Sequence, residues 1–278
     1  MRFFYRLAAR IPGFICLLIA VSTVVPAQRI VSTDGTLSEI ICGLGLQPKI
    51  VGVDVTSTFP AALKKLRQIG HNRNISAEGV LSLNPDLILV NSKASLNPKL
   101  VGQLKQTGKK VAVFDHEYSI EGTKKLIREV GAYFSKEAEA EIMVKKIDRD
   151  LAAVKRGRGS KKVLFIYARG AGTLMVSGEA TQVDRMIRLS GNKNAATGFK
   201  EYKPLTSEAV LAANPDYLLL FEDGLKSLGG VDGLLKVPGV AHTKAGKNRK
   251  IIEMDGLFLM GFGPRVGAAL AELSEKIR

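Results

Sequence analysis

The side chains that could do chemistry in this chain are few, and the first to consider is a histidine. His71 lies in the stretch "GHNRNISAEG", and the whole sequence holds only three histidines. A neutral imidazole is a common metal ligand, and its charge changes near physiological pH. Just downstream, residues 76–90 read "SAEGVLSLNPDLILV", and residues 206–220 repeat this pattern as "TSEAVLAANPDYLLL". The repeat brings Glu78 and Glu208 to equivalent positions, each in the first turn of an expected helix.

The N-terminus has the layout of a secretory signal peptide. Basic residues and no acidic ones open the chain, an apolar run covers residues 11–20, and Val25 and Ala27 suit a cleavage site. We therefore predict that residues 1–27 are a signal peptide cleaved near Ala27, and that the protein is exported. Cys16 lies inside the apolar run without the surroundings of a lipoprotein cleavage site, so we expect no lipid anchor.

Composition and motifs favour a binding protein over an enzyme. The sequence contains no G-x-S-x-G elbow, no GxxxxGK[ST] phosphate loop and no H-E-x-x-H motif. Cys42 is the one cysteine outside the expected signal peptide, which excludes a disulfide framework. The net charge of +15 is spread over helical faces, and the chain has no tryptophan. This pattern does not favour nucleic-acid binding.

The repeat predicts the architecture. Each copy reads as a short helix that ends before a proline and is followed by a continuous apolar strand, the kind that is buried in a parallel sheet. Further apolar strands are expected at 49–53, 110–114, 162–167 and 250–254. Strands that alternate with helices predict an α/β fold with parallel central sheets in two lobes.

The stretch between the two copies is expected to join the lobes. Apolar residues recur at helical spacing from Leu126 to Val154. Ser135 is expected to begin a final helix of about 20 residues, which would be about 30 Å long and could act as a rigid strut. A ligand cleft is expected between the lobes. The predicted divisions are a signal peptide at 1–27, an N-terminal lobe at 28–122, a linker helix region at 123–158 and a C-terminal lobe at 159–278.

Several stretches, in a fixed order, carry a family resemblance. They include "VGVDVTST", "IGHNRNISAEGVLSLNPDLILV", "SGNKNAATGFKEYKPLTSEAVLAANPDYLLL" and "PGVAHTKAGKNRKII". Together they resemble the periplasmic haemin-binding proteins of bacterial ABC transporters, a helix-linked class that also serves cobalamin and siderophores. The resemblance implies a periplasmic protein that captures haem as its transported ligand and delivers it to a membrane permease. Alternatives are a siderophore or cobalamin carrier on the same scaffold, or an exported haem-sensing or haem-degrading protein.

The resemblance also gives His71 a role. In the haemin-binding relatives a tyrosine usually follows the glycine of this motif, and its phenolate binds the haem iron. Histidine is itself a common axial ligand of haem, so the resemblance implies His71 as the iron ligand. His116, which follows a strand in "FDHEYS", could also face the cleft. Arg169 stands where some relatives carry a histidine and cannot donate a lone pair to iron, so we expect one haem per chain.

A porphyrin cleft should be lined by apolar and aromatic groups with a few polar ones. Basic side chains can pair with the propionate carboxylates. The residues expected at the propionates and along the cleft are Arg73, Arg169, Lys203, Phe59, Tyr202, Met254, Phe258 and Met260.

The paired carboxylates have a separate expected role. In this transporter class one acidic residue on each lobe docks onto the permease, and by motif these are Glu78 and Glu208. A carboxylate in the first turn of a helix also suits the positive end of the helix dipole, which alone could account for both. The expected partners are haemin, the permease and an outer-membrane haem receptor upstream. We expect a monomer that binds no nucleic acid.

Overall fold

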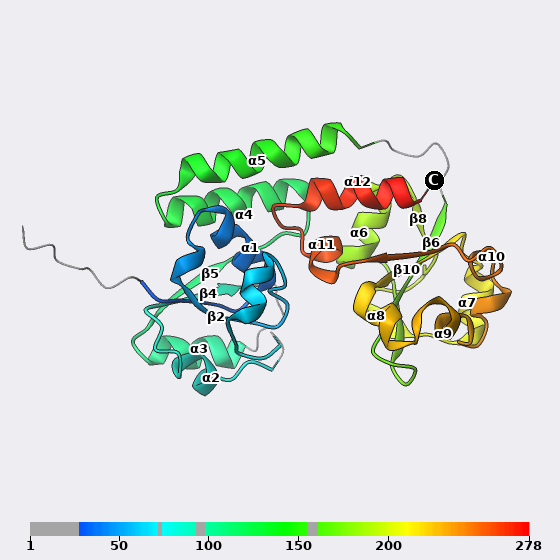
Figure 1. Cartoon of the computed structure of the whole chain (residues 1–278), viewed down its shortest axis with the longest axis horizontal. Coiled ribbons are helices and arrows are strands. Elements are labelled where there is room, and N and C mark those ends of the chain that lie inside the picture. Colours follow the sequence, from blue (N-terminus) through cyan, green and yellow to red (C-terminus); the bar gives the residue numbers. More distant parts are fainter. Residues whose placement is uncertain (1–27, 72–73, 93–97, 155–160, 278) are drawn as a thin grey trace, which may run out of the picture.

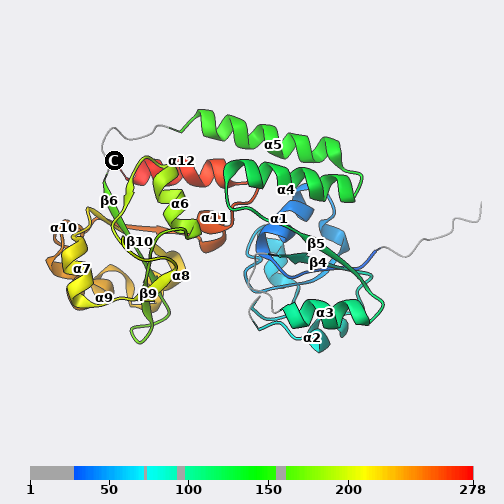
Figure 2. The same cartoon turned by 180° about the vertical axis from the view of Figure 1, so that it is seen from behind.

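The computed structural model describes residues 28–71, 74–92, 98–154 and 161–277. The predicted signal peptide and Arg73 lie outside these residues. Figure 1 shows two lobes side by side, each built around a sheet, and Figure 2 shows the same arrangement from behind. Helices α4 (Ile120–Tyr133), α5 (Glu137–Ala152) and α12 (Val266–Lys276) run across one side of both lobes.

The N-terminal lobe is a parallel sheet covered by helices. Its strand order is β3-β2-β1-β4-β5, and every neighbouring pair is parallel. The strands are β1 (Ile30–Ser32), β2 (Ile50–Val53), β3 (Arg67–Gln68), β4 (Leu87–Asn91) and β5 (Lys110–Phe114). The helices of this lobe are α1 (Gly35–Gly43), α2 (Ala77–Leu81) and α3 (Pro98–Gln106). The sheet explains the apolar runs in the sequence, because β4 is buried along its whole length.

The C-terminal lobe contains a mixed sheet. Its order is β11-β10-β6-β7-β9, with β8 also paired to β6. Strands β6, β10 and β11 are parallel as predicted, and the short β8 also pairs in parallel with β6. The β6–β7 and β7–β9 pairs are antiparallel, which the sequence had not indicated. The strands are β6 (Lys162–Ala168), β7 (Leu174–Ser177), β8 (Lys193–Asn194), β9 (Tyr202–Pro204), β10 (Tyr217–Phe221) and β11 (Ile251–Met254). The helices are α6 (Gln182–Leu189), α7 (Ser207–Ala213), α8 (Glu222–Ser227), α9 (Gly230–Leu235), α10 (Lys244–Lys247) and α11 (Gly256–Met260).

The two copies of the Asn-Pro-Asp repeat fold in the same way. Asn84 and Asn214 both have left-handed backbone conformations, with φ of 43° and 39°. Asn214 is the C-cap of α7, and Asn84 lies just after Ser82, the C-cap of α2. The aspartate after each proline then accepts a backbone hydrogen bond from the start of the neighbouring strand. Asp86 accepts from Arg29 at 2.8 Å, and Asp216 accepts from Lys162 at 2.9 Å. The repeat therefore encodes a helix stop together with a link to the adjacent strand.

The joining region is an antiparallel pair of helices. Gly131 on α4 makes the close approach, because a Cβ atom at this position would lie 2.5 Å from the Cβ atom of Ala140 on α5. Ser135, which was expected to begin the final helix, instead lies in the turn between α4 and α5 with φ of 52°. Helix α5 packs against both α4 and α12, so it spans the two lobes.

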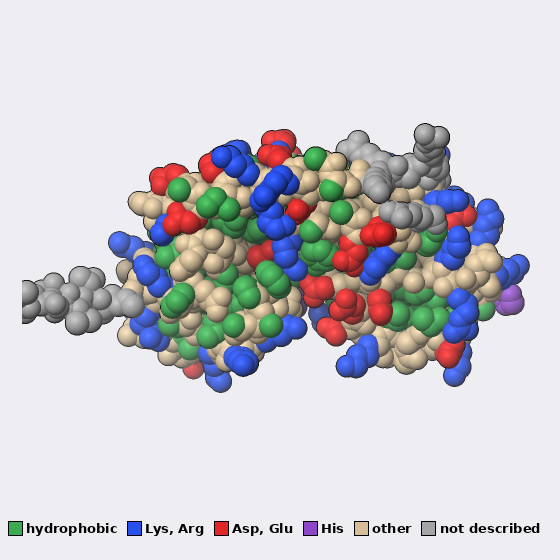
Figure 3. Space-filling model, turned by 45° about the horizontal axis from the view of Figure 1, so that its top comes forward, with side chains coloured by type: hydrophobic (Ala, Val, Ile, Leu, Met, Phe, Trp, Pro, Cys, Tyr) green, Lys and Arg blue, Asp and Glu red, His purple; other side chains and the backbone are tan. Residues whose placement is uncertain are grey.

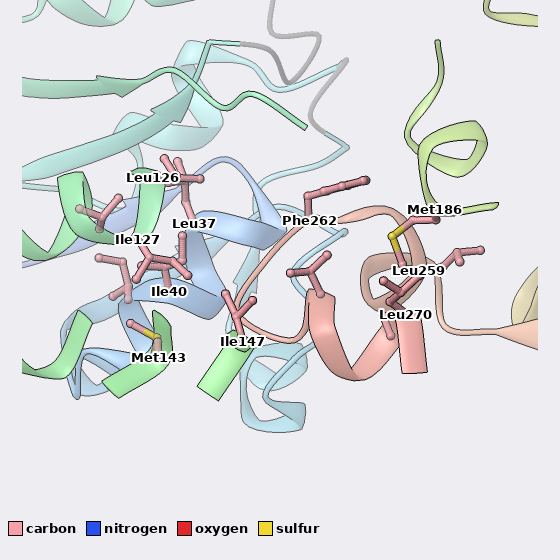
Figure 4. Close-up of a cluster of buried hydrophobic side chains, with 14 of the residues drawn as sticks. Leu37, Ile40, Leu126, Ile127, Met143, Ile147, Met186, Leu259, Phe262 and Leu270 are labelled. Carbon is pink, nitrogen blue, oxygen red and sulfur yellow. The ribbon is translucent and has the colours of Figure 1, made fainter. Parts of the chain in front are cut away.

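A hydrophobic core cluster extends across both lobes. Figure 4 shows part of it, with side chains from α1, α4 and α5 continuing into those from α6, α11 and α12. The labelled members are Leu37, Ile40, Leu126, Ile127, Met143, Ile147, Met186, Leu259, Phe262 and Leu270. The whole cluster is called the shared core below. It fixes the position of one lobe against the other. Within the residues that the structure describes, no helix is both long and apolar enough to cross a bilayer.

Candidate ligand-binding cleft

Polar side chains gather where the strands of the N-terminal sheet end. They are Asp34 after β1, Asp54 after β2, Asn91 at the end of β4 and His116 after β5. His71 lies just beyond β3, at the same edge of the sheet. Ligands of open α/β sheets bind at the carboxyl ends of parallel strands. This edge is therefore the N-terminal side of the candidate site.

Two of these groups are buried carboxylates. Asp34 accepts hydrogen bonds from the backbone of Leu37 at 3.0 Å and from the amide of Asn91 at 3.3 Å. Burial raises the pKa of Asp34 to about 6, and the nearby charge of Asp54 adds to the rise. Burial also raises the pKa of Asp54, against the lowering effect of hydrogen bonds such as that from the Thr56 hydroxyl at 2.5 Å.

His71 is fixed at this edge through its backbone. The carbonyl of Gly70 accepts a hydrogen bond from the N–H of Val55 at 3.0 Å, which ties the loop to the end of β2. Gly70 has φ of 100°, a conformation that favours glycine. The His71 side chain is half-buried, and its charge lowers the pKa of Asp54.

His116 does not face the cleft, contrary to the expectation from its position after a strand. Its side chain is fully buried, and Nε2 lies 3.1 Å from the carbonyl oxygen of Phe262. The hydroxyl of Thr123 donates to the same oxygen at 2.8 Å. Burial lowers the pKa of His116 to about 4. This histidine is a link between the N-terminal lobe and the C-terminal segment.

Aromatic side chains form the matching side of the C-terminal lobe. The ring of Tyr167 lies 6.4 Å from that of Tyr202 and 6.1 Å from that of Phe221, measured between centroids. All three are half-buried against the shared core, which places them on the sheet face nearer the N-terminal lobe. The guanidinium of the exposed Arg169 lies 5.6 Å from the Tyr167 ring.

Lys203 is separated from this aromatic group. Its amine lies 4.7 Å from the ring centroid of Phe199, which packs against a different core cluster. Successive residues of a strand point to opposite faces of a sheet. Tyr202 and Lys203 are neighbours on β9, so the structure brings the tyrosine to the cleft side and turns the lysine away from it.

The apolar residues predicted for the cleft divide into two groups. Phe59 is 41% exposed in the loop after β2. Phe258 and Met260 on α11 are half-buried at the edge of the shared core. Met254 is fully buried within that core, so the prediction that it lines the cleft is wrong. As the last residue of β11, it points to the inner face of the sheet.

An arginine that the sequence analysis had not singled out joins the two sides. The Cζ atom of Arg265 lies 3.7 Å from the ring centroid of Phe59 and 4.9 Å from that of Phe258. Its Nε and Nη2 atoms donate to the two carboxylate oxygens of Glu39 at 2.8 and 2.9 Å. Burial raises the pKa of Glu39, and the hydrogen bonds from Arg265 oppose this rise.

The surface is hollowed between the lobes. Figure 3 shows a notch at this place, with acidic side chains gathered on its C-terminal side. Acidic residues cluster where β10 and β11 end, and the pKa of Glu222 is raised by partial burial and then by the nearby charges of Asp255, Glu253 and Asp223. The notch is called the interlobe cleft below. A negative rim of this kind disfavours the close approach of a carboxylate.

The two predicted docking carboxylates are exposed and lie on different lobes. Glu78 is in the first turn of α2, where the Ser76 hydroxyl accepts from the backbone of Gly79 at 3.0 Å. Glu208 is in the first turn of α7, where the Thr206 hydroxyl plays the same part. Helix α2 lies on the side of the N-terminal lobe away from α5, and α7 lies at the outer end of the C-terminal lobe (Figures 1 and 2).

Tyr167, Phe221, Glu39 and Arg265 were missed from the sequence. For the two aromatic residues a signal existed, since Tyr167 and Phe221 stand at or next to the carboxyl ends of predicted strands. Glu39 and Arg265 are 226 positions apart, and no local pattern links them.

Comparisons with known proteins identify relatives over nearly the whole chain. Residues 30–256 match the family described as periplasmic binding protein. The solved structure of the periplasmic heme-binding protein RhuT from Roseiflexus sp. RS-1, in apo form, is 40% identical, with a TM-score of 0.85. The match covers 90% of this chain and 97% of RhuT.

Two further comparisons bear on the ligand. The periplasmic heme-binding protein BhuT in complex with two hemes is 36% identical with a TM-score of 0.82, and the match covers 90% of this chain and 97% of BhuT. An uncharacterized ABC transporter substrate-binding lipoprotein of Bacillus subtilis, YvrC, is 29% identical over 256 residues, which are 90% of this chain and 80% of YvrC. Vitamin B12-binding proteins of Vibrio species also match, at 23% identity.

Proposed function

Because the chain belongs to the periplasmic binding protein family, we propose that it captures haem in the periplasm and delivers it to the permease of an ABC transporter. The observation that carries this proposal is the likeness to RhuT, which extends over 90% of the chain at 40% identity. The cobalamin carriers are more distant relatives, at 23% identity.

The interlobe cleft suits a flat, largely apolar ligand. The loop after β2 in the N-terminal lobe supplies Phe59, and α11 supplies Phe258 and Met260. The sheet of the C-terminal lobe supplies Tyr202 from β9. Apolar and aromatic surface of this kind buries a porphyrin, while a few polar groups orient it.

His71 is the proposed iron ligand. Its loop is tied to the end of β2 by backbone hydrogen bonding and lies at the carboxyl edge of the sheet, which supports a role in the cleft. Neutral imidazole binds haem iron through one ring nitrogen. Because the His116 side chain is buried in the interior, His71 is the better candidate for the iron ligand.

The charges around the cleft favour one orientation of the haem. The acidic residues that follow β10 and β11 repel the propionates. Arg169 is exposed beside Tyr167 and can pair with a propionate carboxylate. We therefore assign the propionates to the Arg169 side, and Lys203 is left out of the assignment because it packs over Phe199.

The proposed docking partners of the permease are Glu78 and Glu208. Their exposure, their equivalent places in the repeat and their position on separate lobes support one contact per lobe. A carrier that docks through both carboxylates would present its cleft to the permease between them.

The direct test is a titration of the purified protein with haemin, followed by absorption. The expected result is a saturable Soret band that shifts from that of free haemin. Cyanocobalamin and a ferric siderophore serve as matched competitors, since both are ligands of the same class of carriers. Saturable binding of either competitor with no change on adding haemin would overturn the proposal.

A further inference from the structure

The stack around Arg265 is built more tightly than a surface ion pair requires. Both carboxylate oxygens of Glu39 accept from the same guanidinium, at 2.8 and 2.9 Å. The Glu39 side chain is only 5% exposed and that of Arg265 is 22% exposed. A bidentate pair of this kind fixes the plane of the guanidinium as well as its position.

The plane of Arg265 determines what can pack on it. Phe59 lies over the guanidinium at 3.7 Å, a shorter separation than the 4.9 Å to Phe258. One face of the Phe59 ring is therefore covered by the cation, and yet the residue remains 41% exposed. The remaining surface of the ring is open to solvent.

Phe59 needs such a support because its own segment offers little. It lies in a bend of the loop after β2, outside any helix or strand. An exposed aromatic side chain in a loop loses rotamer freedom when a ligand orders it, and this loss weakens binding. A ring already held in one orientation avoids that loss.

From this arrangement we propose that Arg265 is a positioning residue for ligand binding, and that it holds the Phe59 ring as a stacking platform for a flat aromatic ligand in the interlobe cleft. The inference rests on the proposed haem-binding function and adds to it the residue that orders the platform. Arg265 acts through Phe59 and does not itself touch the ligand. Glu39 acts one step further back, because it sets the plane of the guanidinium.

The test is a double-mutant cycle on haemin affinity, with the variants Phe59→Leu, Arg265→Lys and the two combined. Leucine keeps most of the apolar volume of Phe59 and removes the ring. Lysine keeps the charge opposite Glu39 but loses the planar fork. Aromatic and cation–π contacts predict that each single variant weakens haemin binding by about three- to tenfold. In the Phe59→Leu background, Arg265→Lys should weaken it no further.

Arg128→Gln is the matched control. Arg128 also pairs with a glutamate, Glu141, through Nε and Nη2, but the structure gives it no aromatic contact within the described residues. We expect wild-type haemin affinity for this variant. Thermal unfolding of every variant identifies losses that come from misfolding, and affinity is compared only well below each midpoint.

The possible outcomes separate this inference from the proposed function. Wild-type protein that does not bind haemin overturns both. A second outcome is that wild type binds haemin and Arg265→Lys weakens the affinity equally in wild type and in Phe59→Leu. Arg265 would then act independently of Phe59, and only the positioning role would be overturned. Unchanged affinity in both single variants also overturns it.

Discussion

Replacing Asp34 with asparagine should stabilise the folded protein at neutral pH. Asp34 is buried at the start of α1, and burial raises its pKa from 3.8 to about 6. The folded state therefore binds the proton more tightly than the unfolded state does. The stability that protonation confers is fully present below pH 3.8 and is lost as the pH rises through about 6. At pH 7 the protein carries the cost of a buried charge.

The size of this effect follows from the pKa shift. A rise from 3.8 to about 6, at about 1.36 kcal/mol for each pH unit, corresponds to about 3 kcal/mol. Asparagine is as good an N-cap as aspartate, so the hydrogen bond from Leu37 can be kept. The amide of Asn91, which now donates to Asp34, must turn to accept instead, and we allow about 1 kcal/mol for imperfect geometry. The expected gain is about 2 kcal/mol at pH 7.

Urea unfolding at pH 7 and at pH 4 measures this gain. The Asp34→Asn variant should be more stable than wild type at pH 7, and the difference should shrink toward pH 4. Glu117→Gln is the control, because it removes the charge of an exposed carboxylate and so reports the general effect of adding net positive charge to a basic chain. A gain of equal size at both pH values, or equal in both variants, would refute the reasoning about the buried charge.

Four further predictions concern the cleft and its partners. His71→Ala should weaken haemin binding and shift the Soret band, whereas His71→Tyr should restore a phenolate-ligated spectrum; unchanged spectrum and affinity in the alanine variant would remove His71 as the ligand. Binding should also weaken on acidification, because imidazole coordinates iron only when neutral, and a flat pH profile for affinity would contradict this. One haemin should saturate each chain, and a titration with a clear endpoint at two, as in the BhuT complex, would contradict this stoichiometry. Glu78→Lys combined with Glu208→Lys should abolish permease-dependent haem uptake and leave haemin affinity intact; uptake that survives would reduce both carboxylates to helix-dipole partners.

The fold was predictable from the sequence where it depends on repeated local patterns. The two Asn-Pro-Asp copies encode the same helix stop and strand link, so the α/β lobes and most buried strands could be found from the chain alone. The antiparallel strands β7 and β9 could not be found in this way. Each is short, and each is set by pairing with a neighbour rather than by a continuous apolar run.

The candidate site was predictable only in part, and the misses have a common cause. His116 and Met254 both lie near the end of a strand, as cleft residues do, yet both are buried because the C-terminal segment and the shared core cover them. The partnership of Glu39 with Arg265 joins opposite ends of the chain. These features depend on how the lobes meet, which no local pattern records. The roles of His71, Arg169, Glu78 and Glu208 stay predictions.

The shared core also determines the stage of synthesis at which the N-terminal lobe can finish folding. Helix α12 is synthesised after the other described elements, and its buried residues Val266, Ala269, Leu270 and Leu273 pack into the core that α1, α4 and α5 also form. Phe262 supplies the carbonyl that meets His116 and Thr123 only at the same late stage. The N-terminal lobe therefore keeps an uncovered apolar face until α12 has been synthesised. A truncation within α12 should leave the N-terminal lobe unfinished, although that lobe lies more than a hundred residues upstream.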